Sequence, residues 1–208
     1  MYLNQEQFNV FYKSKNHPVI LEIPTMNYIT IEGQGNPNEY PFQQAVEALY
    51  TIAYTIKMSY KKPNPPKGYY AYTVFPLEGL WDLFDKSKPS SDKSNYQYKL
   101  MIQQPDFVDE ILFQSFKQQS IKKNDNPRLY DVKFEKISDG LCCQMLHLGP
   151  YDDEPASFTI MESYVQNEGF YRLSKRHKEI YLSDPRKAEP SKMKTILRFE
   201  IKKIEVKP

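Results

Sequence analysis

The chain has 208 residues, with 28 Lys and Arg against 26 Asp and Glu, which gives a formal net charge of +2 at pH 7. So small a charge creates no field that attracts DNA or an acidic surface, and we expect no direct binding of nucleic acid. The length suffices for one substantial core, organised as one domain or two small ones.

Aromatic residues are abundant, with 17 Tyr, 12 Phe and one Trp. Tyr and Trp in such numbers often line clefts that take flat ligands, besides filling cores. The adjacent Cys142 and Cys143 are unsuited to pair with each other, and the three histidines are far apart in sequence. We therefore expect neither a disulfide between these cysteines nor a metal site.

No stretch of the chain resembles a targeting or membrane-spanning segment. The N-terminal residues lack the apolar core of a secretory leader, and no later run approaches the roughly 20 apolar residues of a membrane helix. We expect a cytoplasmic protein.

The first half of the chain predicts the order strand, helix, strand, strand. Residues 26–32 alternate and are rich in β-formers, and residues 41–58 place apolar side chains at helical spacing. Turn-prone residues flank this helix, including Gly35, Asn36 and Pro37 before it. Strands are expected at 69–75 and 96–103, with a polar, flexible loop at 86–95.

A helix at 105–122 and a strand at 131–137 are expected to connect the halves. The second half repeats the first: a strand at 142–148, a turn at Gly149 and Pro150, a helix at 153–167, and strands at 177–182 and 195–201. We therefore predict one α+β domain over residues 1–208, with tandem β-α-β-β repeats at 18–104 and 141–208 and a connector at 105–140. Internal duplication usually places a site between the copies, so we expect a ligand groove there.

Strand alternation sorts the candidate site residues of the second half by face. Ile180 and Leu182 are expected to pack on a helix, which leaves His177, Glu179 and Tyr181 on the groove side. A carboxylate near aromatic rings is a recurring arrangement for holding flat ligands. The alternative is that Glu179 is an ordinary exposed residue of the sheet.

In the first half, Phe75 and Leu77 take the helix-facing role, and the groove residues are Tyr70, Tyr72 and Val74. The strand is expected to bend after Pro76 and at Gly79, just before Trp81. Trp81 is then either a core residue or a wall of the pocket.

Met145 and His147 share a face of the strand at 142–148. Either His147 is a satisfied half-buried side chain, or it reaches the groove together with Met145. Several catalytic motifs are absent: Gly33-Gln34-Gly35 reads as a turn, and Ser157 and Ser174 lack a glycine elbow. The acidic cluster of Asp152, Asp153 and Glu154 is explained by a helix N-terminus, which favours negative charge. Covalent catalysis and metal-dependent hydrolysis are therefore disfavoured.

Six runs of the chain, in order, resemble stand-alone members of the GyrI-like small-molecule-binding family: MNYITIEGQG, ALYTIAYTIK, PLEGLW, MLHLGPYDDE, EIYLSDPR and KTILR. The combination of PLEGLW, HLGPYDDE and EIYLSDPR is specific. The resemblance implies two SH2-like β-α-β-β motifs related by pseudo-two-fold symmetry, similar in fold to the effector domains of multidrug-responsive transcription factors.

Members with PLEGLW-like and EIYLSDPR-like motifs look like hydrolases that open the strained cyclopropane of DNA-alkylating natural products. The resemblance implies that Glu179 lies at the bottom of the groove, that Trp81, Tyr72 and Tyr181 form an aromatic cage, and that no cofactor is needed. One departure is that the late strand is commonly preceded by two histidines, whereas here Arg176 precedes His177.

In such a reaction Glu179 would act as a general base on water, and a tyrosine such as Tyr72 would donate a hydrogen bond to the developing negative charge. Two other functions remain open. The protein could bind drugs without chemistry, or it could act as an effector module through a partner. The lack of an attached DNA-binding segment disfavours the effector role.

Overall fold

A computed structural model describes residues 11–205. The expectations about the N-terminal leader and about the ends of the predicted domain fall partly outside this range. Two compact units make up the described chain: unit 1 comprises residues 26–137, and unit 2 comprises residues 11–25 and 138–205. Both contain helices packed on antiparallel strands, which confirms the α+β fold class.

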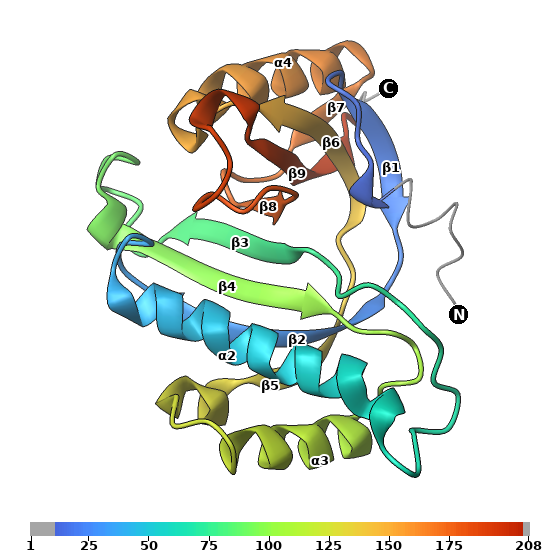
Figure 1. Cartoon of the computed structure of the whole chain (residues 1–208). Helices are drawn as coiled ribbons and strands as arrows, with labels where there is room; N and C mark the ends of the chain where they lie inside the picture. The colour runs from blue at the N-terminus through green and yellow to red at the C-terminus, as the bar shows by residue number, and fades with distance from the viewer. Residues whose placement is uncertain (1–10, 206–208) are drawn as a thin grey trace. The chain divides into compact units, whose positions relative to one another are not determined.

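Unit 1 is an antiparallel sheet with the strand order β3-β4-β2-β5 (Figure 1). Its strands are β2 (Met26–Gln34), β3 (Leu77–Leu83), β4 (Tyr96–Gln103) and β5 (Lys133–Ile137). Its helices are α2 (Tyr40–Lys57) and α3 (Glu110–Ile121), with the short 3-10 helices Met58–Lys61, Lys93–Asn95 and Pro127–Asp131. Because β5 pairs with β2, the strand expected to be a connector is part of this sheet.

Helix α2 confirms the prediction from apolar spacing. A proline stands in its first turn, where the missing N–H costs no hydrogen bond. Its buried stripe includes Ala45, Leu49, Ile52 and Ile56. Helix α3 starts later than predicted because the Asp109 side chain caps it, accepting a hydrogen bond from the Leu112 N–H at 2.8 Å.

The strand predicted at residues 69–75 is absent from the structure. Tyr and Phe favour strands only through packing on a sheet, and here these rings pack on one another and on Phe107 instead. The strand begins at Leu77, and its pairing with β4 continues through Gly79 without interruption, while the bend expected there stays a prediction.

Unit 2 has the strand order β1-β6-β9-β8, and β7 pairs with β9. Its strands are β1 (Val19–Ile23), β6 (Gly140–Leu148), β7 (Phe170–Arg172), β8 (His177–Tyr181) and β9 (Lys194–Lys203). Helix α4 (Glu154–Asn167) follows the 3-10 helix Tyr151–Asp153, and a second 3-10 helix covers Pro190–Lys192. The sequence reasoning missed β1 and β7.

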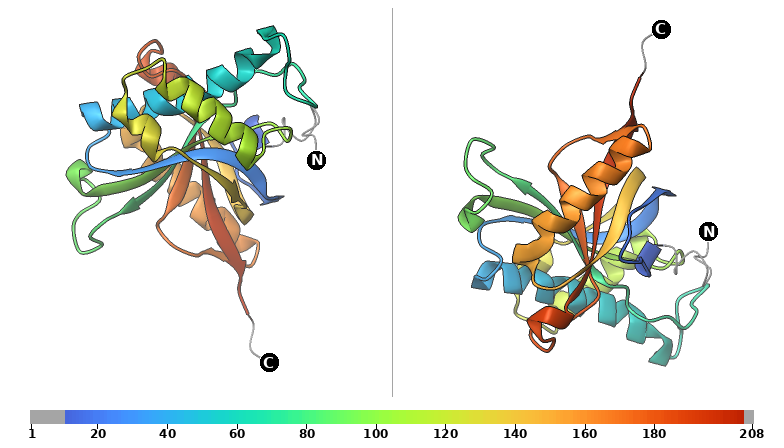
Figure 2. Two further views of the ribbon diagram at one scale, coloured as in Figure 1. Left: turned by 90° about the horizontal axis from the view of Figure 1, so that it is seen from below. Right: turned by 90° about the horizontal axis from the view of Figure 1, so that it is seen from above.

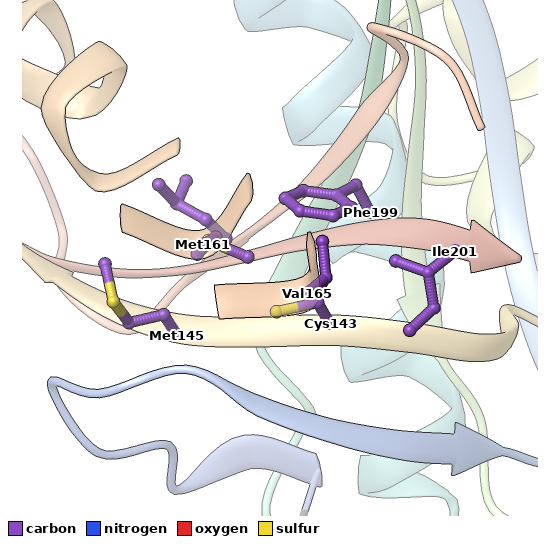
Figure 3. Packing of buried hydrophobic residues seen from close by; sticks show 7 residues of the cluster. Cys143, Met145, Met161, Val165, Phe199 and Ile201 are labelled. Carbon is purple, nitrogen blue, oxygen red and sulfur yellow. The ribbon is translucent and has the colours of Figure 1, made fainter. Parts of the chain in front are cut away.

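Helix α4 covers one face of the β6 and β9 strands, as the right-hand view in Figure 2 shows in orange. The core beneath it joins Met161 and Val165 of α4 to side chains of both strands (Figure 3). Cys143 belongs to this core, and both cysteines are buried free thiols. Burial raises the pKa of Cys142 and of Cys143 to about 12, so neither is a thiolate nucleophile at neutral pH.

The two units share a strand order. In unit 1 the sequence β2-α2-β3-β4 pairs as β2-β4-β3, and in unit 2 the corresponding elements pair as β6-β9-β8. Each first strand is followed directly by a glycine with positive φ, Gly35 at 108° and Gly149 at 126°. Side chains rarely adopt such angles, so both turns into the helices depend on glycine. Among the helices of residues 11–205, none has the length and hydrophobicity to cross a bilayer.

Candidate functional site

Strand β8 presents His177, Glu179 and Tyr181 on one face of the unit 2 sheet. Glu179 stands opposite Leu197 of β9, and Leu197 belongs to the core that α4 covers. Since side chains alternate along a strand, the three polar groups lie on the same side of the sheet as α4.

The face on which Ile180 lies is therefore turned away from α4, and the prediction that Ile180 and Leu182 pack on the helix is wrong. The physical reason is that both faces of β8 are buried. Lys178, next to Ile180, is 3% exposed, and its Nζ lies 2.7 Å from Asp139 Oδ1. Arg198 pairs with the same carboxylate at 2.6 Å. A buried ion pair lies on one face of β8, and a carboxylate lies on the other. The two faces therefore do not differ in polarity, although the prediction relied on such a difference.

Glu179 is held by His177, whose Nε2 lies 3.2 Å from Glu179 Oε1. The Glu179 side chain is 12% exposed, and the His177 side chain is 22% exposed. His177 Nδ1 faces the Lys175 carbonyl oxygen at 3.2 Å, and the Phe158 ring packs edge-on against the imidazole at 4.8 Å. Both ring nitrogens therefore face oxygen atoms that can accept hydrogen bonds, one in the Lys175 carbonyl and one in the Glu179 carboxyl group.

Glu154, the first residue of α4, completes this cluster. Glu154 is 6% exposed and shares a hydrogen bond with Glu179. Burial raises the pKa of its carboxyl far above the usual range, and the negative charge of Glu179, the shared hydrogen bond and Asp152 act in the same direction. The sequence reasoning assigned Glu154 to the helix N-terminus with Asp152 and Asp153. No local signal separates it from these neighbours, because its partner lies on a distant strand.

Two tyrosines adjoin the carboxyl groups. The rings of Tyr151 and Tyr181 meet edge to face at 5.9 Å. Burial raises the pKa of Tyr151, and the charges of Glu179, Glu154 and Asp184 raise it further. Tyr151 is thus a hydroxyl that keeps its proton at neutral pH. The sequence reasoning named Tyr181 and missed Tyr151.

Met145 and His147 lie on β6, on the side of α4. Met145 belongs to the core of unit 2 and is 3% exposed. His147 Nδ1 lies 2.9 Å from Ser157 Oγ, and Nε2 lies 3.0 Å from the Pro150 carbonyl oxygen. The imidazole therefore ties β6 to the first turns of α4 through Nδ1 and to the turn after β6 through Nε2. Ligand contact by Met145 or His147 stays a prediction.

In unit 1, Tyr70 and Tyr72 belong to an aromatic cluster with Tyr69 and Phe107. Tyr70 meets Phe107 edge to face at 5.6 Å, and Tyr72 meets it at 6.1 Å. Burial raises the pKa of Tyr72, as do Tyr69 and Tyr70. Its buried Oη has no hydrogen-bond partner within residues 11–205.

Trp81 is 7% exposed and lies on the α2 side of β3. Its ring stacks on Phe42 of α2 with centroids 5.8 Å apart, and Tyr96 and Tyr98 flank it at 5.8 and 5.5 Å. Gly33 makes room for Tyr98, since a Cβ there would lie 2.4 Å from its ring. Gly33 lies within β2 and is not the turn residue that we expected.

Donor atoms of Glu154, His177 and Glu179 lie within 4.8 Å of one another, close enough for one cation. Metal ligands must be deprotonated, and a buried carboxyl group that holds its proton is a poor ligand. A cation at this place would therefore have to displace the proton of Glu154.

A model of the GyrI-like small molecule binding domain matches residues 17–202. The chain belongs to this family. The match confirms the resemblance seen in the six sequence runs, and it shows that the chain is a small-molecule-binding domain.

Solved structures extend the comparison. This GyrI-like chain is 37% identical to an uncharacterized conserved protein from Listeria innocua, with a TM-score of 0.89, covering 95% of this chain and 98% of the other. It is 36% identical, over the same shares, to a protein from Listeria innocua described as a hydrolase, with a TM-score of 0.86. The EcmrR C-terminal domain, at 14% identity and a TM-score of 0.52 over 90% of this chain and 98% of that domain, shares the fold alone. No curated protein matches this GyrI-like chain.

Proposed function

We propose that this GyrI-like protein is a hydrolase that binds planar aromatic xenobiotics and opens a strained cyclopropane by adding water. The observation that carries the proposal is the cluster on β8, where His177 and Glu154 contact Glu179 in a largely buried position. The similarity to a Listeria innocua protein described as a hydrolase supports chemistry over binding alone.

The substrate class is a cyclopropane conjugated to a dienone. Water attacks a ring carbon of the cyclopropane, and Glu179 accepts a proton from that water as the C–O bond forms. The cyclopropane C–C bond breaks, and its electron pair moves into the dienone to give a phenolate. Protonation of the phenolate completes the addition of one water. The product no longer alkylates DNA, so the reaction would detoxify the compound in the cytoplasm.

We assign the hydrogen-bond donor for the developing phenolate to Tyr72, on the evidence of unit 1 alone. Its raised pKa keeps the hydroxyl protonated, and its Oη has no partner among the described residues. A donor placed where negative charge develops stabilises the transition state.

Aromatic side chains would hold the flat substrate by stacking. Tyr181 stands beside the Glu179 cluster in unit 2, and Trp81 and Tyr70 belong to aromatic clusters of unit 1. His177 orients Glu179 in this proposal.

The competing function is sequestration, in which the protein binds the compound and leaves it intact, and the description of the family as small-molecule binding favours it. The test is to incubate the pure protein with a cyclopropane-bearing alkylator and to follow the mass of the compound. A gain of one water that depends on Glu179 supports the hydrolase. Tight binding of an unchanged compound overturns the hydrolase and supports sequestration.

A further inference from the structure

Glu154 and Glu179 bring two carboxyl groups together in a largely buried place, with oxygen atoms that lie within 4.8 Å of each other. An ionised carboxylate only accepts hydrogen bonds, so two ionised groups have no donor between them. Two negative charges this close would repel each other with little solvent to screen them, so we expect one of the two groups to hold a proton, and the position of that proton decides which group is a base.

Three observations place the proton on Glu154. Glu179 Oε1 lies 3.2 Å from His177 Nε2, and an imidazole N–H that donates a hydrogen bond there stabilises a negative charge on Glu179. Glu154 is 6% exposed, and its Oε1 has no hydrogen-bond partner within residues 11–205. An ionised Glu154 would be a buried charge with one oxygen unsatisfied, which is far more costly than a buried neutral acid.

One effect opposes this assignment. Glu154 begins α4, and the N-terminus of a helix favours negative charge. Asp152 and Asp153, at the same N-terminus, are exposed and supply that charge without loss of solvation. The helix therefore does not require Glu154 to ionise.

We propose that Glu154 is a neutral carboxylic acid that donates its proton in a hydrogen bond to Glu179, and so keeps Glu179 ionised and oriented as the base. Glu154 is thus a positioning residue. Its effect on turnover rests on the proposed hydrolase function, whereas its protonation does not. The titratable groups around the pair are His177 on β8, Asp152 and Tyr151 before α4, and Asp184 after β8.

The direct test is infrared spectroscopy of the whole protein at pH 7. We expect the carbonyl band of a protonated carboxyl group in the wild type and its loss in Glu154→Gln. Asp153→Asn, which removes an exposed carboxylate from the same helix N-terminus, is the control and retains the band. A wild type without the band, or a Glu154→Gln protein that keeps it, overturns the proposal.

Stability against pH gives a second readout that needs no substrate. Above about pH 4.3 the carboxyl group of the unfolded chain releases its proton, whereas the folded chain keeps it. The folded state therefore loses stability as the pH rises. Between pH 5 and 8, the unfolding equilibrium constant of the wild type is expected to rise by about tenfold per pH unit relative to Glu154→Gln. Equal slopes would contradict the proposal. Histidines titrate in this pH range, so the comparison is repeated with His177→Asn present in both proteins. The difference in slope between the proteins with Glu154 and with Gln at this position should persist.

Turnover and cation binding separate the remaining outcomes. An amide can donate the same hydrogen bond, so Glu154→Gln is expected to retain at least about fivefold more activity than Glu154→Ala. Absence of hydrolysis in every variant would reject the proposed function and leave the infrared result standing. If Zn²⁺ or Mg²⁺ abolishes the infrared band and raises the melting temperature of the wild type but not of Glu154→Gln, the cluster is a cation site and the proposal fails.

Discussion

Strands β3 and β8 occupy equivalent places in the strand orders of their own units, yet they present opposite chemistry to their helices. The α2 side of β3 carries Trp81, which packs among aromatic rings. The α4 side of β8 carries His177 and Glu179, which face the acid Glu154. One topology thus supports an aromatic surface in unit 1 and an ionisable cluster in unit 2. The fold fixes where a side chain points, and the residue type decides what the position does.

The largest expected effect concerns the core that holds α4 over the ionisable cluster. Met161→Ala empties part of this buried core, where Met161 is fully inaccessible. We expect a loss of about 2–5 kcal/mol in the free energy of unfolding, measured in urea. Ile160, on the same helix, is 54% exposed, so Ile160→Ala is the matched control and should change little. A small loss for Met161→Ala would mean that α4 is held by something other than this core.

Glu179→Gln tests whether β8, and not β3, carries the group that takes part in the reaction. The amide keeps the shape of the side chain but cannot accept a proton from water, so turnover should fall more than about tenfold while ligand affinity is retained. Rates are measured by mass spectrometry and affinity by calorimetry. Glu189→Gln, which removes an exposed acid of unit 2, is the control. Unchanged turnover in Glu179→Gln would remove Glu179 from the mechanism.

Tyr70→Leu tests the aromatic side of the comparison. Loss of one ring from the cluster with Phe107 should weaken binding of a flat ligand by about 2- to 10-fold, the range of a single aromatic contact. The turnover of bound ligand should not change, because Tyr70 has no part in proton transfer. Tyr40→Leu replaces a tyrosine that is 68% exposed and controls for the general loss of an aromatic ring. Equal affinities of the two variants would argue against stacking on Tyr70.

Local patterns predicted the helices and most strands well, because α2 and α4 bury stripes that follow helical spacing. They failed at residues 69–75, where aromatic residues of high strand propensity pack on one another without a partner strand. Strands β1 and β7 were also missed. Shortness explains only β7, which has 3 residues, because β5 and β8 were predicted although they have the same length of 5 residues as β1.

Only the part of the candidate site that lies on a single strand could be predicted from the sequence. Alternation grouped His177, Glu179 and Tyr181 on one face, as the structure shows. The prediction of which face packs on α4 was wrong, because Lys178, paired with Asp139, makes the face of β8 that is turned away from α4 polar as well. Glu154 was out of reach, since its environment comes from a tertiary contact that no spacing encodes.

The smallest expected effect contrasts two carboxyl groups, one in each unit. Glu135 of β5 lies 3.1 Å from Lys99 Nζ and accepts a hydrogen bond from Thr30. Burial alone would raise the pKa of Glu135, but the contacts with Thr30 and Lys99 outweigh it and lower the pKa. Its contribution to stability is therefore present above the unfolded pKa of about 4.3 and is lost as the pH falls through the folded pKa, opposite in sign to that of Glu154.

Glu135→Gln should reduce the free energy of unfolding at pH 7 by about 1 kcal/mol or less, because the side chain is 33% exposed and solvent screens the ion pair. The difference from the wild type should shrink as the pH falls from 5 to 3. Urea unfolding across this range checks it, with Glu47→Gln, an exposed acid of α2, as the control. A difference that grows on acidification would mean that Glu135 is held as a neutral acid. The contrast between a charged carboxyl group in unit 1 and a neutral one in unit 2 would then be lost.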